Sequence, residues 1–308
     1  MWVTVILVLA GVVIAAALAF WLVGERGRLM LPSTRRNMQA SRMHGSSIGT
    51  GLHAYIYGRW TNLYVKRYLP WALRRGRGKH AKWWVDHYHS KVLTHDHAQA
   101  VVTLDHDIAL RDLEQIIPFA AARNLVLNAS PDVAVFECAC RHAKPDHCQP
   151  SQVCMVIGQP FVDFIVEHNP ATSRRLTQAE ALELLQAEHE RGHVHSAWFK
   201  NVMLDRFYAI CNCCKCCCGG IESMTKYGLP VVASSGYVAE LSAETCKNCG
   251  VCVDACPFDA LSKGETSAVF DWEKCMGCGV CAQRCRQGAL ALARDEKKGL
   301  PMDVRMMT

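Results

Sequence analysis

Cysteine is absent from the first 137 residues of this 308-residue chain, although the remainder contains 18 of them. A secreted domain held by disulfide bonds is usually short and distributes its cysteines along its length. The crowding therefore argues against a disulfide scaffold and favours thiols kept free for metal in a reducing compartment. Half of the residues are apolar, which excludes a disordered or low-complexity chain, and the length suits about two domains.

Charged residues are missing between positions 2 and 23. An apolar run of this length can cross about 30 Å of hydrocarbon as a helix. A cleaved signal peptide is the alternative, because Ala17-Leu18-Ala19 has the form of a cleavage site. No Lys or Arg precedes the run, however, and it continues past that site to Val23. The sequence therefore predicts an uncleaved membrane anchor.

Acidic residues are nearly absent from the segment that follows the apolar run. Residues 24–85 hold ten Arg and three Lys but one acid, Glu25, whereas the rest of the chain is net acidic. The positive-inside rule then predicts a single-pass protein of the cell inner membrane, with the bulk of the chain in the cytoplasm. Because an anionic lipid surface accounts for this charge, nucleic acid is not expected as a partner.

Aromatic and basic side chains alternate between residues 51 and 77. The aromatic residues are Tyr55, Tyr57, Trp60, Tyr64, Tyr68 and Trp71, and the basic ones are Arg59, Lys66, Arg67, Arg74 and Arg75. This mixture suits the headgroup region of a membrane, so the segment is predicted to lie along the cytoplasmic surface. The alternative is an ordinary amphipathic helix packed on the soluble part.

Nucleotide-binding fingerprints are also lacking. Neither Gly219-Gly220 nor the glycines from Gly45 to Gly51 have the spacing of a P-loop or a dinucleotide site, so no nucleotide or flavin is expected. Histidines are frequent between residues 82 and 107 but have no ligand spacing, and we interpret them as ordinary packed or surface residues. They are His87, His89, His95, His97 and His106.

Local patterns predict three elements in the middle of the chain. Residues 107–123 have apolar residues at helical spacing until Pro118, which predicts a helix. Residues 132–136 read as a short buried strand that leads to Cys138 and Cys140. Thr177 and Glu180 form a capping-box signature for a helix that runs to about Arg191 and that Gly192 ends.

The C-terminal part contains an internal duplication with an offset of 29 residues. Its two copies have the spacing C-x2-C-x2-C-x3-C, at Cys246, Cys249, Cys252 and Cys256 and again at Cys275, Cys278, Cys281 and Cys285. Three thiolates so spaced can wrap three corners of a cubane within one short loop. We expect the fourth cysteine to start a helix and to reach the cluster of the other half.

This duplication closely resembles the bacterial two-cluster ferredoxin family over about residues 240–295. The resemblance implies one [4Fe-4S] cluster held by Cys246, Cys249, Cys252 and Cys285. It implies a second held by Cys275, Cys278, Cys281 and Cys256. Zinc is the alternative metal, since C-x2-C pairs also bind zinc. Arg286 departs from the family because proline usually stands there, so the turn after Cys285 is expected to differ.

Ten further cysteines precede the duplication, in two sets. The first set is Cys138, Cys140, Cys148 and Cys154, and the second is Cys211, Cys213, Cys214, Cys216, Cys217 and Cys218. Residues from about 90 to 300 resemble a group of larger membrane-anchored or soluble iron–sulfur proteins. These place a C-x-C-R segment and a C-N-C-C-x-C-C-C run before a two-cluster ferredoxin domain, and the resemblance transfers no settled activity.

Adjacent cysteines in the second set cannot all face one cubane, because neighbouring side chains diverge. The ten thiols are therefore predicted to serve one or two additional iron–sulfur clusters. A non-cubane cluster, as bound by the Cys-Cys pairs of heterodisulfide-reductase-like proteins, is one form. Zinc at the first set is the competitor, with His142 and His147 as substitute ligands. Disulfides are not expected in the cytoplasm.

Together these features predict an α+β protein in four parts. They are a transmembrane helix at 1–23, a basic aromatic juxtamembrane segment at 24–85, a mixed α/β Cys-rich middle domain at 86–235 and a ferredoxin-like domain at 236–308. We expect a membrane-anchored electron carrier that exchanges electrons with redox partner proteins. The alternatives are an oxidoreductase subunit with a catalytic Cys-ligated cluster in the middle domain, and a redox or oxygen sensor.

Overall fold

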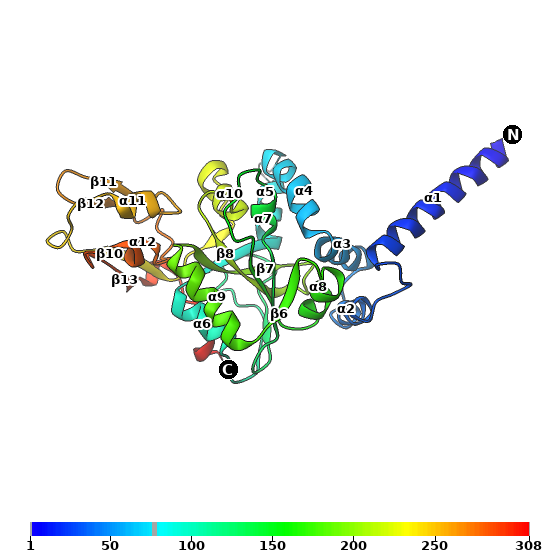
Figure 1. The fold of residues 1–308 in the computed structure, drawn as a ribbon, viewed down its shortest axis with the longest axis horizontal. Helices are drawn as coiled ribbons and strands as arrows, with labels where there is room; N and C mark the ends of the chain where they lie inside the picture. Colours follow the sequence, from blue (N-terminus) through cyan, green and yellow to red (C-terminus); the bar gives the residue numbers. More distant parts are fainter. Residues whose placement is uncertain (1, 76–78, 308) are drawn as a thin grey trace.

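The computed structural model describes residues 2–75 and 79–307. The end of the aromatic and basic segment at Arg77 lies outside the described residues, as do the side chains of Arg74 and Arg75. Figure 1 shows an elongated molecule in which the first helix and the C-terminal small strands lie at opposite ends of a central sheet. The mixed α/β architecture expected from the sequence is confirmed.

The N-terminal helix α1 (Trp2–Gly24) projects away from the body of the molecule (Figure 1). Its apolar stretch, Thr4–Gly24, is long enough for a membrane span, and the 18-residue apolar window within it has no buried residue. Contacts with the body begin at its last turn, where the Trp21 ring stacks on Tyr55 at 5.4 Å and Phe20 meets Trp60 at 4.6 Å.

Four helices connect α1 to the sheet: α2 (Pro32–Met43), α3 (Ile48–Arg59), α4 (Thr61–Arg75) and α5 (Lys79–His87). Glu25, the one acid of this segment, is completely buried. Its carboxylate accepts hydrogen bonds from the Leu31 amide and, at 2.9 Å, from the Thr34 hydroxyl, and so fixes the start of α2. The surface charge of the segment is consequently all basic.

Helix α3 packs on the body, as the alternative interpretation of the aromatic segment stated. Tyr55 and Tyr57 are buried, and Gly58 lies so close to the Phe164 ring that a Cβ there would approach it to 2.8 Å. Along α4, by contrast, Lys66 and Arg67 are exposed, and so is about half of the Trp71 side chain. The segment thus has one face against the protein and another directed outward.

The body is built on a seven-stranded sheet in the order β6-β4-β5-β8-β7-β1-β9. Within the described sheet, neighbouring strands are antiparallel except β1 and β9, which run parallel. The strands are β1 (Tyr88–Leu93), β4 (Val133–Glu137), β5 (Gln152–Ile157), β6 (Ser173–Leu176), β7 (Val194–Lys200), β8 (Arg206–Cys213) and β9 (Val232–Ala233).

Helices cover both faces of this sheet (Figure 1). Helices α4, α5, α7 (Ala139–His142) and α10 (Gly219–Tyr227) lie on one side, and α6 (His95–Val102) and α9 (Gln178–Glu190) on the other. Helix α8 (Phe161–His168) packs against α2 and α3 near the base of α1. The buried core contains Leu93, Leu125, Met155, Ile157, Phe199 and Phe207.

The helix predicted over residues 107–123 is wrong. The chain forms the hairpin of β2 (Ile108–Leu110) and β3 (Leu125–Leu127), separated by turns. Asp112 and Ala122 have left-handed backbone angles, with φ of 58° and 53°, which a helix does not allow. The apolar residues that gave the helical pattern are still used, since Ile117 is completely buried in the core.

The strand predicted before Cys138 is confirmed as β4, and the helix predicted after Thr177 is confirmed as α9. Both halves of the capping box are present: the Glu180 amide donates to the Thr177 hydroxyl, and the Glu180 carboxylate accepts from the Thr177 amide at 2.8 Å. Gly192 follows the helix with φ of 77°, the left-handed conformation expected of a helix stop.

The C-terminal part consists of two small antiparallel pairs. Strand β10 (Tyr237–Leu241) pairs with β13 (Leu290–Arg294), and β11 (Leu261–Lys263) pairs with β12 (Ala268–Phe270). Short helices α11 (Val251–Ala255) and α12 (Val280–Arg284) stand between them. Cys256 and Cys285 follow the last residues of these helices, so the expectation that the fourth cysteine starts a helix is wrong.

The last residues of the chain return to the central body. After the short η1 helix (Glu296–Lys298), the η2 helix (Val304–Met306) packs on α6, and Met302 and Val304 are completely buried in the core. Asp303 lies 3.6 Å from the His97 ring. The C-terminal part is therefore tied to the sheet at both of its ends.

Candidate functional site

The eight cysteines of the duplication form two interleaved groups. The Cys252 thiol has its pKa raised by burial and then by the thiols of Cys246, Cys249 and Cys285. The second group is Cys256, Cys275, Cys278 and Cys281, which together line one apolar-walled cavity with about 340 Å³ of space free of protein atoms. In each group the fourth thiol comes from the other copy of the repeat.

The backbone repeats with the sequence. Gly250 and Gly279, 29 residues apart, have φ of 83° and 79° and precede α11 and α12. Asn248 and Gly277, at the same offset, also have left-handed angles. These turns direct amide N–H groups at sulfur: the Asn248 amide donates to Cys246 Sγ at 3.4 Å. Such donors stabilise thiolate ligands and tune a bound cluster.

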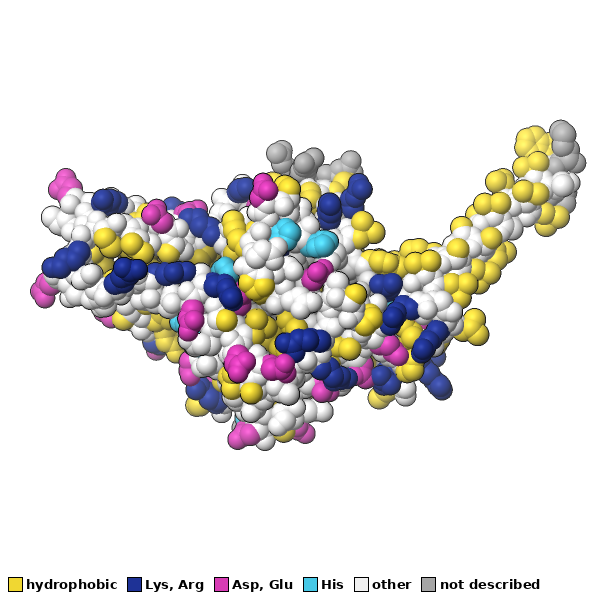
Figure 2. All heavy atoms as spheres, in the orientation of Figure 1, with side chains coloured by type: hydrophobic (Ala, Val, Ile, Leu, Met, Phe, Trp, Pro, Cys, Tyr) yellow, Lys and Arg dark blue, Asp and Glu magenta, His cyan; other side chains and the backbone are white. Residues whose placement is uncertain are grey.

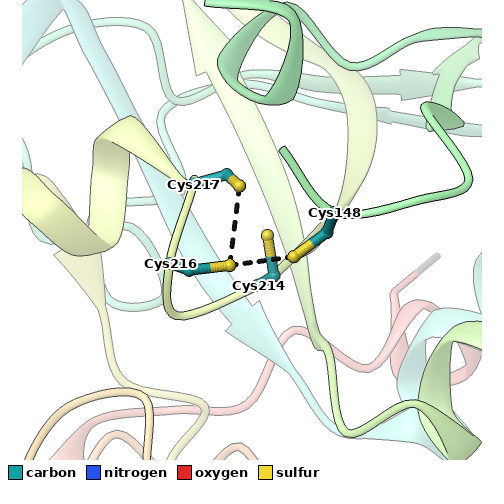
Figure 3. Close-up of side chains that lie close together, drawn as sticks. All are labelled: Cys148, Cys214, Cys216 and Cys217. Atoms are coloured by element: carbon teal, nitrogen blue, oxygen red, sulfur yellow. Dashed lines mark hydrogen bonds between the residues drawn. The ribbon is translucent and has the colours of Figure 1, made fainter. Parts of the chain in front are cut away.

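Four of the ten upstream thiols converge from two loops. The Sγ atoms of Cys148, Cys214, Cys216 and Cys217 all lie within 4.8 Å of one another. Figure 3 shows Cys148 reaching this four-thiol group from one loop and the other three from the loop after β8, with dashed contacts from Cys216 to Cys148 and Cys217. These two contacts measure 2.9 Å and 3.5 Å. Thiols so close suit a shared metal centre.

The other six thiols surround a neighbouring cavity, which has about 550 Å³ of space free of protein atoms and whose lining also includes Cys214 of the four-thiol group. We call this set the six-thiol ring. Around it, each thiol interacts with the next in the order Cys211, Cys154, Cys138, Cys140, Cys218 and Cys213. The ring closes electrostatically between the last and the first of these.

Strand pairing explains how the ring forms. Cys211 and Cys213 are two residues apart on β8 and therefore share a face of the sheet. Cys154 comes from the neighbouring strand β5, beside Cys211. Cys138 follows β4 and caps the N-terminus of α7, and Cys218 caps the N-terminus of α10. Pairings that are distant in sequence thus assemble the ring.

The structure divides the ten thiols differently from their order in the sequence. Cys148, grouped with Cys138, Cys140 and Cys154 by sequence, belongs to the four-thiol group. In the second set, the adjacent pairs Cys213/Cys214 and Cys217/Cys218 are each divided between the two centres, whereas Cys216 and Cys217 both belong to the four-thiol group. The two proposed substitute ligands are engaged elsewhere: His142 lies 3.7 Å from Glu137, and His147 bonds to Gln149 and the Lys144 carbonyl.

A buried cation accompanies the upstream thiols. Arg141, the arginine of the C-x-C-R segment, is completely buried and donates to Glu188 at 3.0 Å and to the Asn212 carbonyl at 3.3 Å. Burial alone would lower its pKa, but the neighbouring Cys214 thiol and Glu188 carboxylate raise it instead. The guanidinium therefore supplies a fixed positive charge beside the candidate metal-binding thiols, a role that the sequence analysis did not assign.

Aromatic side chains form the remaining wall of the six-thiol cavity. Tyr57 from α3, Tyr88, Trp198 and Tyr208 line it, and the Tyr57 and Tyr208 hydroxyls are 2.7 Å apart. Gly220 is needed here for close approach, since a Cβ at this position would come within 2.7 Å of the Trp198 ring. The basic aromatic segment at 24–85 thus contributes directly to the metal-binding candidate, which its composition did not indicate.

The comparison with family models decides the nature of the C-terminal part. Residues 239–297 match the family described as 4Fe-4S dicluster domain. Comparison with curated proteins gives no match. The dicluster domain and the Cys-rich middle region together indicate an iron–sulfur protein. The cavity lined by four thiols and the amide donors to sulfur fit the clusters that such a domain binds.

The dicluster domain adjoins the upstream thiols. Lys215, which lies between two members of the four-thiol group, forms a 2.8 Å ion pair with Asp259, three residues after Cys256. Phe258 and Met276 from the cysteine loops of the dicluster domain belong to the same buried core as Cys213 and Cys218. The candidate metal centres are therefore joined by packed protein and not by a flexible linker.

Proposed function

We propose that the protein is a membrane-anchored electron carrier with two [4Fe-4S] clusters in the dicluster domain and additional metal centres at the six-thiol ring and the four-thiol group. The main support for this proposal is that the two cysteine-rich parts share one buried core and are joined by the Lys215–Asp259 ion pair. A bound [4Fe-4S] cluster supplies one-electron oxidation and reduction. The thiols hold the clusters, and amide donors, burial and Arg141 set their potentials.

The anchor part of the proposal rests on the junction between α1 and the body. Arg59 donates to the carbonyls of Gly24 and Val23, and His168 bonds to the Gly24 carbonyl. Cleavage before this junction would remove Phe20 and Trp21 from their aromatic partners. A retained α1 of 23 residues would span about 30 Å of hydrocarbon.

The orientation follows from charge. Figure 2 shows Lys and Arg side chains gathered around the base of α1, over α2, and Arg26, Arg28, Arg35 and Arg36 are exposed there. Basic residues next to a span remain on the cytoplasmic side and are attracted to anionic lipid. The dicluster domain, at the far end of the molecule, would then face soluble redox partners (Figure 1).

We expect a reporter fused to the C-terminus to be active in the cytoplasm and the protein to remain in membranes washed with alkali. The reason is the one-sided distribution of basic residues after α1. A matched variant with α1 removed should leave the membrane fraction or bind it only at low salt. A C-terminus on the periplasmic side would contradict both the orientation and the cytoplasmic compartment.

Replacing Arg286 by proline should lower the potential of the cluster held with Cys285 by roughly 20 mV, because an exposed cation favours the more negative reduced cluster. The turn itself should tolerate the change. Cys285 and Cys256 have similar extended angles, with ψ of 95° and 115°, and Pro257 already follows Cys256. The Arg286 amide donates no hydrogen bond to a described residue.

Redox titration followed by EPR measures this shift. Arg286→Gln removes the same charge without proline and serves as the matched control, so both variants should shift equally while iron content stays constant. An unchanged potential in both would mean that solvent screens the guanidinium completely. The backbone angles at Cys256 and Cys285 are similar, so the prediction that the turn after Cys285 differs is wrong.

A catalytic role for the six-thiol ring is the second candidate. Its cavity has more thiols than one cubane needs, and Tyr57, Tyr208 and the buried Lys200 stand nearby. Burial lowers the pKa of Lys200 to about 7, which suits proton exchange near neutral pH. A carrier has fully ligated iron, whereas an enzyme has an iron site that binds an added ligand. Cyanide or azide titration followed by EPR distinguishes them.

A further inference from the structure

Three histidines from separate elements meet on the sheet face that carries α6 and α9. His95 is in the first turn of α6, His189 in the last turn of α9, and His195 in β7. Each offers a ring nitrogen, and these atoms all lie within 4.8 Å of one another. His195 is buried, while His95 and His189 are partly exposed, so the cluster can be reached from solvent.

Hydrogen bonds determine which His95 nitrogen carries the proton. The Gln186 amide nitrogen donates to the Glu190 carboxylate at 2.8 Å, so its oxygen is the atom that lies 3.0 Å from His95 Nε2. Because a carbonyl oxygen only accepts, His95 Nε2 must be the N–H donor. The neutral ring then has an unprotonated Nδ1 with a free lone pair.

The same reasoning applies to His195. The Asn212 amide nitrogen donates to the Val153 carbonyl at 2.6 Å, which leaves Asn212 Oδ1 as the atom 2.6 Å from His195 Nδ1. His195 Nδ1 must therefore be the donor, and its Nε2 is unprotonated. These two side-chain amides act as the orienting partners that metal-bound histidines usually have.

The two unprotonated nitrogens face each other. His95 Nδ1 and His195 Nε2 are 3.2 Å apart, so two lone pairs point into one space with no hydrogen between them in the neutral rings. A single proton would satisfy that pair and leave the third histidine unused. The His189 ring stacks on His95 with centroids 4.2 Å apart, and one of its ring nitrogens lies within 4.8 Å of the other two ligand atoms.

We propose that His95, His189 and His195 form a zinc site that is separate from the cysteine centres. Two nitrogens bound at 2.0–2.1 Å to a tetrahedral zinc ion are about 3.3 Å apart, close to the observed separation. Three imidazoles leave a fourth position for water or an exogenous ligand. The ion would link α6, α9 and β7 at one point. This inference does not depend on the electron-transfer proposal.

Zinc bound to the anaerobically purified, full-length protein tests the site. After equilibration with a buffered low concentration of free Zn²⁺, we expect about one zinc per chain by elemental analysis. X-ray absorption at the zinc edge should show nitrogen ligands near 2.0 Å with imidazole scattering, and no sulfur near 2.3 Å. Iron and sulfide content, measured on the same samples, reports whether the cysteine centres remain intact.

Variants locate the ion. His95→Gln and His189→Gln, both at partly exposed positions, should lower zinc affinity at least tenfold with iron content unchanged. Gln186→Leu, which removes the partner that orients His95, should weaken binding by about tenfold. His80→Gln, at an exposed histidine outside the group, is the control and should bind zinc as the parent does.

Three results would overturn the proposal. They are no zinc bound by the parent protein, zinc bound through sulfur, and zinc retained at full affinity in both His95→Gln and His189→Gln. Sulfur ligation would assign the ion to the four-thiol group instead. Loss of both zinc and iron in His95→Gln would indicate general unfolding of that variant. The other two variants, His189→Gln and Gln186→Leu, would then decide: the proposal stands only if they lose zinc and keep their iron.

Discussion

The double variant Cys216→Ser/Cys217→Ser should lose about four irons per chain and keep the EPR signals of the dicluster domain. The expected parent content is about 12 to 16 irons, because eight belong to two cubanes and the rest to the upstream centres. Both replaced thiols belong to the four-thiol group, in which Cys216 lies 2.9 Å from Cys148. Iron and acid-labile sulfide per chain, after anaerobic purification, measure the loss.

A second double variant tests the iron content of the six-thiol ring independently. Cys154→Ser/Cys211→Ser removes two neighbours in the ring that come from adjacent strands β5 and β8. This variant should lose the iron of the ring and retain that of the four-thiol group. Replacing one thiol of the ring and one of the four-thiol group, as in Cys213→Ser/Cys217→Ser, should remove the iron of both centres. The three variants together therefore test whether the ten thiols form two separate centres, and not only whether they bind iron.

Zinc at the four-thiol group would give a different pattern. The parent would then contain zinc bound through sulfur, and Cys216→Ser/Cys217→Ser would release zinc instead of iron. About eight irons in the parent and in every upstream variant would contradict the proposed additional iron–sulfur centres. As a matched control, Cys285→Ser should remove a dicluster signal, since Cys285 joins the group of Cys252.

Local spacing made the dicluster domain predictable. Its eight cysteines lie within two loops of the same design, so the sequence contains almost all of the information that forms each group. Even the left-handed turns recur at the repeat, at Gly250 and Gly279. The helix position was wrong because α11 and α12 end, and do not begin, at the fourth cysteine.

The upstream centres could not be derived in the same way. Cys154 meets Cys211 only because β5 pairs with β8, and Cys148 reaches Cys216 through a loop 68 positions earlier in the chain. Periodicity also misled over residues 107–123, where apolar residues at helical spacing fill a hairpin and its turns. Non-local pairing determined both results, and a single sequence does not reveal which strands pair.

Arg141→Met should destabilise the body by about 3 kcal/mol, equivalent to a fall of about 10 °C in the midpoint of thermal unfolding. The guanidinium and the Glu188 carboxylate are both inaccessible to solvent and lie 3.0 Å apart. Removing one member of a buried pair leaves the other charge with fewer partners. Glu188 would retain His193 at 2.6 Å and Arg191 at 2.7 Å, so the expected loss lies at the low end for buried pairs.

A double-mutant cycle isolates this interaction. Arg141→Met/Glu188→Leu removes both charges and should recover much of the lost stability, because an apolar pair of similar volume is often as stable as a buried ion pair. Arg174→Met, which breaks the exposed pair with Glu180, is the matched control and should cost less than about 1 kcal/mol. Circular dichroism on heating measures the parent, both single variants Arg141→Met and Glu188→Leu, the double variant and the Arg174→Met control.

The stability and the metal content separate two roles of Arg141. If the residue only balances Glu188, the double variant should recover stability and keep its upstream iron. If its charge also supports the thiolates, as its proximity to Cys214 and Cys138 suggests, the double variant should recover stability and still lose iron. A stable Arg141→Met protein with full iron would contradict both roles, since a buried cation would then be dispensable beside the thiols.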